Sequence, residues 1–194
     1  MTIPASLAAA GNREGAERAF LRARRQFMAG DRIDMQDLAA DMDVDRSTLF
    51  RWIGNRDHLL AMILISLAEP AIRAAEAQTT SEGATRIRDV ARRYADGVLG
   101  SAFFQAYLRR ESDRALRLLT SKASAVQAHI VTAFEELIET ERRAGRLQHS
   151  MESRPLAYIV VRIIESFVYT DTITGDPPDA AMVSDAVGAL MHVD

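Results

Sequence analysis

The chain of 194 residues contains no cysteine, which excludes disulfide bonds, thiolate catalysis and metal sites with cysteine ligands. Its 5 prolines and 10 glycines are too few for a collagen-like or proline-rich disordered chain. The longest apolar runs fall far short of the roughly 18 residues that cross a membrane. The N-terminus lacks the charged and apolar regions of a signal peptide, so we expect a cytoplasmic protein with no membrane segment.

Charge of neither sign dominates the chain. The 24 basic and 27 acidic residues leave a net charge of −3, which argues against a protein that simply coats nucleic acid. Apolar residues make up 48% and charged residues 26%, an ordinary globular balance. The length allows one domain, or a small domain fused to a larger one.

Apolar residues recur at helical spacing almost throughout, and no run of β-branched residues alternates with period two. The pattern therefore predicts an all-α protein. A loose arm is expected at 1–12, followed by helices at about 13–28, 35–42, 46–53, 55–77, 85–98, 101–110, 113–120, 123–144, 155–174 and 179–191.

The chain lacks the usual marks of an enzyme. None of its 4 histidines has a second metal-ligating residue at helical spacing. No phosphate-binding glycine loop and no nucleophile elbow occurs. Glu135 and Glu136 lack the Glu-x-x-His partner of di-iron bundles. We therefore expect no catalytic activity, no metal and no cofactor.

The most informative segment is 34–53, DMQDLAADMDVDRSTLFRWI. Asp34 and Asp45 can cap two short helices that are joined by a tight turn. Apolar residues on both helices can meet in one small core. This is the layout of a helix-turn-helix motif, whose second helix enters the major groove of DNA. A pair of surface helices with solvated charges is the alternative when these two helices are taken alone.

The second short helix carries side chains that suit DNA. Arginine can bond guanine in a bidentate manner, serine and threonine can bond phosphate or base edges, and aromatic rings can contact thymine methyl groups or sugars. The first residue of the next helix is a further arginine, where free amides already favour phosphate. The candidates are Arg46, Ser47, Thr48, Phe50, Arg51, Trp52 and Arg56.

The spacing from Leu38 to Leu60 resembles the tetracycline-repressor (TetR) family without a gap. The family pattern has an apolar residue and Ala, then Gly-Val-Ser, Thr-Leu-Tyr, an aromatic residue with Phe, and Lys-Glu-x-Leu-Leu. The chain has Leu38-Ala39, Asp43-Val44-Asp45, Thr48-Leu49-Phe50 and Arg56-Asp57-His58-Leu59-Leu60. The similarity covers nearly all of 13–60, and the later part matches only in the number and order of its helices.

Four positions depart from the family pattern. Asp43 replaces the turn glycine and must adopt a left-handed conformation, which aspartate tolerates better than most residues. Asp45 replaces the capping serine and brings negative charge close to DNA. Phe50 replaces tyrosine and loses a phenolic donor, whereas Arg56 replaces lysine and keeps the charge.

The resemblance implies a three-helix DNA-binding domain at 13–56, followed by a six-helix ligand-binding and dimerisation bundle at 57–194. It implies a homodimer formed through the helices at 155–174 and 179–191, bound to a near-palindromic operator and released by a small apolar ligand. In this assignment Arg46, Ser47 and Phe50 face base edges. Thr48, Arg51, Trp52, Arg56 and Gln36 contact the DNA backbone, with Arg51 open between base and phosphate.

Polar residues form a stripe along the otherwise apolar helix at 155–174. Tyr158, Arg162, Glu165 and Tyr169 are separated by 4, 3 and 4 positions. One interpretation, which we favour, is an Arg162–Glu165 ion pair between packing tyrosines. The other is a polar strip that lines a ligand cavity.

The resemblance also implies a ligand pocket between the DNA-binding domain and the dimer helices. Its candidate residues are Tyr94, Phe103, Tyr107, Val126, Ile130, Phe134 and Tyr169, although aromatic residues at helical spacing can equally form an ordinary core. The segment 109–120 resembles the QsdR-type branch of the family, whose ligands are implied to be lactone- or acyl-like.

A second hypothesis is a helical-bundle carrier of small ligands that does not bind DNA. The surface at 46–56 distinguishes the two, because a carrier has no use for Arg46, Arg51 and Arg56 around a capped helix.

Overall fold

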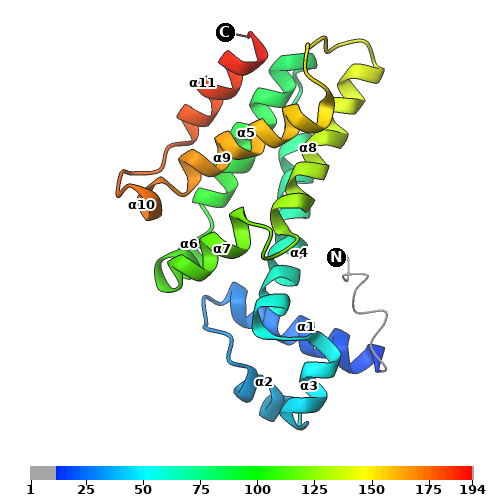
Figure 1. The fold of residues 1–194 in the computed structure, drawn as a ribbon, viewed down its shortest axis with the longest axis vertical. Helices are drawn as coiled ribbons and strands as arrows, with labels where there is room; N and C mark the ends of the chain where they lie inside the picture. Colours follow the sequence, from blue (N-terminus) through cyan, green and yellow to red (C-terminus); the bar gives the residue numbers. More distant parts are fainter. Residues whose placement is uncertain (1–11, 194) are drawn as a thin grey trace. The chain divides into compact units, whose positions relative to one another are not determined.

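The computed structural model describes residues 12–193, which form eleven helices and no strand (Figure 1). The all-α prediction is therefore confirmed. The arm predicted at 1–12 lies outside the described residues except for Asn12. The side chain of Asn12 caps the first helix by accepting a hydrogen bond from the backbone N–H of Gly15 at 3.0 Å.

The helices lie close to the predicted ranges. They are α1 (Arg13–Met28), α2 (Met35–Asp41), α3 (Arg46–Ile53), α4 (Arg56–Ala77), α5 (Gly83–Leu99), α6 (Ala102–Arg110), α7 (Ser112–Thr120), α8 (Val126–Arg143), α9 (Ser153–Val168), α10 (Thr170–Ile173) and α11 (Ala180–Met191).

Eight helices follow α3, compared with the six expected for the bundle. One reason is that the helix predicted at 155–174 is broken at Tyr169, whose φ of −105° and ψ of 14° are not helical. The residues after Tyr169, with three threonines and an isoleucine in five positions, have low helix propensity because β-branched side chains lose rotamer freedom in a helix. The short helix α10 takes up this segment.

Aspartate side chains begin several helices, as the sequence predicts for Asp34 and Asp45. Asp34 accepts from the backbone N–H of Gln36 at 2.7 Å, and Asp45 accepts from that of Thr48 at 2.7 Å. Asp179 caps α11 in the same way. Each cap satisfies an amide that has no partner inside its helix and so fixes where the helix begins.

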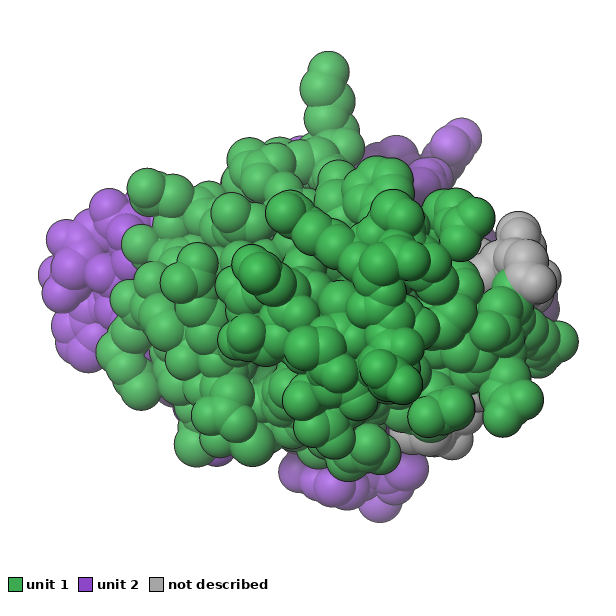
Figure 2. All heavy atoms as spheres, turned by 90° about the horizontal axis from the view of Figure 1, so that it is seen from below, with its two compact units in different colours: residues 1–67, 102–126 green, residues 68–101, 127–194 purple. Residues whose placement is uncertain are grey.

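The chain divides into two compact units that are both discontinuous in sequence (Figure 2). The first unit comprises residues up to Leu67 together with Ala102–Val126, and the second comprises Ala68–Ser101 with the residues from Gln127 onward. Helices α6 and α7 therefore belong to the same unit as the helix-turn-helix segment. The sequence suggests instead a single division after residue 56.

In the first unit, α1 packs against α2, α3 and α6. Phe20, Leu38 and Leu49 are fully buried in its core. At the end of α1, the ring of Phe27 lies edge-on to Phe103 and Tyr107 of α6, with centroid distances of 5.9 and 5.2 Å. This aromatic cluster fixes α6 against the first helix.

In the second unit, α5, α9 and α11 pack against one another. Val160 and Val161 of α9 are buried together with Val183 and Val187 of α11.

The helix α4 is long and apolar enough to cross a membrane. Half of its most apolar stretch is buried within the structure, so α4 is a core helix.

Candidate DNA-binding surface and ligand site

The turn between α2 and α3 has the backbone that the sequence predicts. Asp43 adopts a left-handed conformation with φ +53°. The backbone N–H of Val44 donates to the carbonyl of Ala39 at 3.1 Å and closes the turn. This tight turn allows α3 to begin within a few residues of the end of α2, so that both short helices pack on a common core.

One face of α3 is buried and the opposite face is exposed. Leu49 and Ile53 point into the core with 0% and 1% exposure. Phe50 is 58% exposed, an unusual position for a large aromatic ring. Arg46, Ser47 and Arg51 are exposed on the same helix. The sequence therefore places cations, a hydroxyl and an aromatic ring together on a free helix face.

At the start of α3, the Asp45 carboxylate accepts three hydrogen bonds. Its Oδ1 accepts from Ser47 Oγ at 2.6 Å and from the backbone N–H of Thr48 at 2.7 Å, and its Oδ2 accepts from Thr48 Oγ1 at 3.0 Å. These hydrogen bonds, with that of Ser47 first, lower the pKa of Asp45 to about 2. Arg51 in turn donates to Thr48 Oγ1 at 3.1 Å.

A cleft of about 550 Å³ brings several predicted DNA contacts together in the first unit. Gln36, at the start of α2, lines it with Arg46 and Phe50 of α3. Asp34 and Asp57 also line it, so the cleft itself is not uniformly basic. Among the described residues, no side chain pairs with the guanidinium of Arg46, which leaves it available to a partner.

Arg56, a predicted DNA contact, forms hydrogen bonds within the protein. Its Nε donates to the carbonyl of Ile33, and its Nη1 and Nη2 donate to the two carboxylate oxygens of Glu111, all at 2.6 Å. Its side chain is only 15% exposed. All three nitrogens of Arg56 are thus engaged within the protein.

Trp52 also has a packing role that the sequence does not reveal. A Cβ placed on Gly15 of α1 would lie 2.7 Å from Trp52 Cη2, which is closer than real contacts allow. The indole ring therefore packs directly on the backbone of α1. This contact helps to set the orientation of α3, because Trp52 lies in the last turn of that helix.

The predicted ligand residues are divided between the two units. Phe103 and Tyr107 pack on Phe27 in the first unit, in which Val126 is also buried. In the second unit, Tyr94 and Phe134 meet edge-on with their centroids 6.2 Å apart. Residues of this second group are buried, namely Tyr94, Ile130, Phe134, Glu165 and Tyr169.

A buried acid lies in this second group. Glu165 is 5% exposed and accepts from Gln127 Nε2 at 3.1 Å and from Arg162. Burial raises the pKa of Glu165, and the two hydrogen bonds oppose the rise. The ion pair favoured from the sequence is therefore present. Tyr158, in contrast, is 49% exposed and does not join the buried group.

The hydroxyls of Tyr94 and Tyr169 are both influenced by the charge of Glu165. Burial raises the pKa of both phenols, and the charge of Glu165 adds to the rise. No described residue forms a hydrogen bond with either hydroxyl. Among the described residues, the predicted ligand residue whose buried hydroxyl has no hydrogen-bond partner is instead Tyr107 in the first unit. Buried polar groups are normally bonded, so the Tyr107 hydroxyl calls for a water molecule or a ligand.

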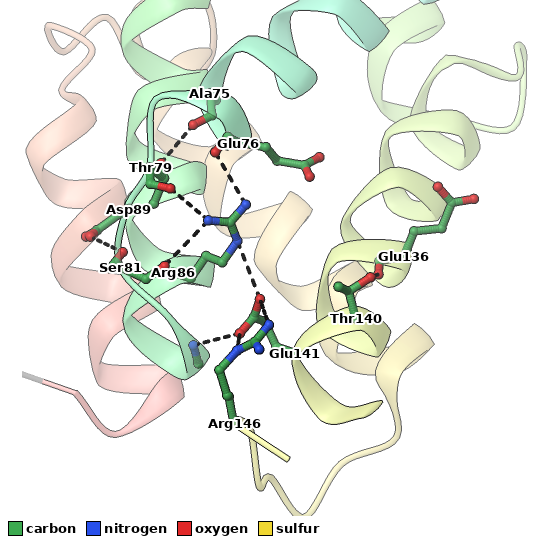
Figure 3. Close-up of polar contacts among 11 residues, drawn as sticks. Ala75, Glu76, Thr79, Ser81, Arg86, Asp89, Glu136, Thr140, Glu141 and Arg146 are labelled. Carbon is green, nitrogen blue, oxygen red and sulfur yellow. Dashed lines mark hydrogen bonds and ion pairs between the residues drawn. The ribbon is translucent and has the colours of Figure 1, made fainter. Parts of the chain in front are cut away.

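A cavity of about 630 Å³ lies in the second unit, lined by the end of α4, the following loop and α8 (Figure 3). No predicted ligand residue lines it. Arg86 donates to the carbonyls of Thr79 at 2.8 Å and Glu76 at 3.3 Å and so holds the end of α4. Glu141 accepts from the backbone N–H of Gly83 at 2.8 Å and from Arg146 at 2.7 Å.

Among the described residues that line this cavity, Glu76 and Glu136 have no such structural partners. Burial raises the pKa of Glu76, and the nearby charge of Glu136 raises it further, while Arg86 and Arg73 oppose the shift. In Figure 3, Glu76 lies near Arg86, and Glu136 lies on α8 apart from the Arg86–Glu141 ion pair. The cavity was not found from the sequence, because its residues come from three segments with no common motif.

The first unit contains a helix-turn-helix motif whose second helix is capped and has an exposed cationic and aromatic face. A second helical unit accompanies it. This combination is typical of helix-turn-helix transcriptional regulators. The sequence model described as "Tetracyclin repressor-like, C-terminal domain" matches residues 82–192, more than half of the chain. The chain therefore belongs to the TetR family, a family of transcriptional regulators and not of enzymes.

Solved structures agree with this assignment. The R. erythropolis transcriptional repressor QsdR, from the TetR family, is 26% identical, with 98% of this chain and 97% of that chain covered and a TM-score of 0.87. A TetR-family transcriptional regulator from Rhodococcus sp. is 16% identical, with 92% and 97% covered and a TM-score of 0.50, which supports the fold alone. No curated protein matches the chain.

Proposed function

We propose that the protein is a homodimeric repressor that acts in the cytoplasm, binds a near-palindromic DNA operator through α3 and is released by a small ligand. The observation that carries the proposal is the exposed face of α3. Arg46, Phe50 and Arg51 are exposed there, on a helix whose opposite face is buried through Leu49 and Ile53. These side chains suit DNA, because arginine bonds guanine or phosphate and an aromatic ring can contact thymine methyl groups.

The family resemblance and the exposed positions on α2 and α3 support an assignment of contacts. Arg46, Ser47 and Phe50 are proposed to face base edges, and Arg51 and Gln36 to contact phosphate and sugar. Thr48 is proposed to hold Arg51 in place through the hydrogen bond between them. Trp52 and Arg56 are proposed to position α3 and α4 instead of touching DNA. Phosphate contacts set the register of the helix, and base contacts select the site.

A homodimer is supported by the outer faces of α9 and α11. Alongside exposed Tyr158, the residues Ile159, Ile163 and Phe167 of α9 are only partly covered within one chain. Met182 of α11 is 44% exposed, and α11 packs beside α9. A two-fold pairing of these faces would bury the apolar stripe and present two α3 helices to successive major grooves, roughly 34–36 Å apart.

The ligand is proposed to contact the buried group around Tyr94, Phe134 and Tyr169. The two phenol hydroxyls without described partners would donate to an acceptor oxygen on an otherwise apolar molecule. A carboxylate ligand is disfavoured, because Glu165 is buried beside them. The Tyr94→Phe variant should keep its fold and its operator affinity but respond more weakly to ligand.

The proposal is tested by incubating the purified protein with sheared genomic DNA and sequencing the retained fragments. Enrichment of a near-palindromic site is expected for the wild type and not for the Arg46→Ala/Arg51→Ala variant. The Arg92→Ala/Arg154→Ala variant is the matched control, because it removes two exposed arginines of the second unit. It should retain the same site.

Absence of any enriched site in the wild type would favour the ligand-carrier hypothesis. A repressor purified with its inducer bound would give the same absence. Denaturing the protein, identifying released small molecules and repeating the capture with refolded protein separates these two cases. Refolded protein that still selects no DNA would contradict the repressor proposal.

A further inference from the structure

The Asp45 carboxylate accepts a hydrogen bond from each of the two hydroxyls at the start of α3. Ser47 Oγ donates to Asp45 Oδ1 at 2.6 Å, and Thr48 Oγ1 donates to Asp45 Oδ2 at 3.0 Å. A hydroxyl group has a single proton to donate and two lone pairs that accept. Both protons are therefore used inside the protein, and the oxygens have only acceptor capacity left.

We propose that Asp45 determines which base edges the protein reads, by making Ser47 and Thr48 meet DNA as hydrogen-bond acceptors. The inference rests on the proposed DNA-binding function. The hydrogen-bond donors on base edges of the major groove are the amino groups of adenine and cytosine. Phosphate oxygens only accept, so neither hydroxyl can donate to the DNA backbone while it is bonded to Asp45.

The two hydroxyls differ in what they can still accept. Thr48 Oγ1 already accepts from Arg51 Nη2 at 3.1 Å. Ser47 is exposed, and no described donor occupies its oxygen. Ser47 is therefore the residue that selects an adenine or a cytosine, and Thr48 serves to align the Arg51 guanidinium.

Asp45 is ionised at neutral pH, as this role requires. The three hydrogen bonds, one of them from the amide of Thr48 at the helix start, hold the pKa of Asp45 at about 2. The carboxylate therefore stays ionised and remains the better acceptor for both hydroxyls. Its negative charge also repels phosphate, which weakens binding to DNA that lacks the preferred bases.

The test uses Asp45→Asn and Asp45→Ser in the full-length protein. The asparagine keeps the size of the side chain and an oxygen that can cap α3, but its NH₂ group cannot accept a hydroxyl proton. The serine keeps a capping oxygen and removes the charge. Asp37→Asn is the control, because Asp37 is an exposed acid of α2 that does not contact Ser47 or Thr48.

Each variant is used to select sites from a randomised double-stranded DNA library, and the bound sequences are compared position by position. The wild type should prefer adenine or cytosine at one position of each half-site. Ser47→Ala and Asp45→Asn should both reduce the preference at that position by about fivefold or more. Asp37→Asn should leave it unchanged. Melting curves of the same samples show whether each variant is folded.

Three outcomes would each contradict a different part of the proposal. A wild type that selects no sequence contradicts the proposed function itself. A wild type that selects a site whose base preferences survive Ser47→Ala and Asp45→Asn contradicts the role of Asp45 alone. An equal loss in Asp37→Asn would assign the effect to negative charge near DNA and not to the captured hydroxyls. Since Ser47→Ala does not remove the cap, it keeps the test decisive even when an Asp45 variant fails to fold.

Discussion

The guanidinium of Arg56 meets the carboxylate of Glu111 through two parallel hydrogen bonds of 2.6 Å each. The pair joins the first residue of α4 to the residue just before α7, and its members are 15% and 12% exposed. A bidentate arginine–carboxylate pair is among the strongest polar contacts in proteins, because the two groups carry opposite charges and form two parallel hydrogen bonds. This pair links the helix-turn-helix segment to α7 within the first unit.

Glu111→Gln should lower the free energy of unfolding by about 1.5–3 kcal/mol, because it leaves the partly buried Arg56 charge with a weaker partner. Urea denaturation of both proteins measures the change. Glu17→Gln removes the exposed Arg13–Glu17 pair and should cost less than about 1 kcal/mol. Equal losses in the two variants would mean that the Arg56–Glu111 pair adds no more than a surface contact.

Acid should weaken the wild type more than the Glu111→Gln variant. Hydrogen bonding to Arg56 lowers the pKa of Glu111 below its ordinary value of 4.5. The pair therefore stabilises the fold fully above pH 4.5, and the contribution is lost as the pH falls through the lower folded-state value. Melting temperatures between pH 7 and pH 3 should show a shallower decline in the variant. A steeper decline would contradict the assigned pKa direction.

Arg56→Lys should leave the salt dependence of operator binding unchanged. Lysine keeps the charge but cannot reproduce the two parallel bonds to Glu111, so only stability should fall. Arg51→Gln, in contrast, should reduce the slope of the logarithm of affinity against the logarithm of salt concentration by about 1. Fluorescence anisotropy with a labelled operator over a salt series measures both slopes. A reduced slope in Arg56→Lys would restore Arg56 to the DNA contacts.

Gly83→Ala should destabilise the second unit by about 2 kcal/mol or more. Gly83 has φ +62°, and a Cβ there would lie 2.5 Å from the carbonyl oxygen of Arg146. The substitution would also disturb the bond from the Gly83 N–H to Glu141. Gly97→Ala is the control, since the α5 backbone there is helical and no described atom is near. It should raise stability by about 0.5–1 kcal/mol, as calorimetry can check.

The local features of the DNA-binding segment could be read from the sequence. The ranges of α1 and α3, the caps at Asp34 and Asp45 and the left-handed Asp43 all depend on residues within about four positions of one another. Capping and helical periodicity act over this distance, so their signals lie in adjacent letters of the sequence.

The features that were not predicted depend on residues far apart in the chain. Arg56 and Glu111 are separated by 55 positions, and no local pattern links them. Phe27 likewise meets Phe103 and Tyr107 only because α1 and α6 fold together. Aromatic spacing alone could not distinguish this core cluster from a ligand pocket, since both use the same residue types.

The discontinuous first unit limits how such a protein can be recombined. A fragment that ends at Leu67 would leave Phe27 without Tyr107 and Arg56 without Glu111, because both partners come from the 102–126 segment. A chimaera that exchanges only residues up to 67 would therefore inherit mismatched partners. Exchange of the whole first unit between relatives therefore requires three crossovers, because α6 and α7 are part of this unit even though they lie in the middle of the chain.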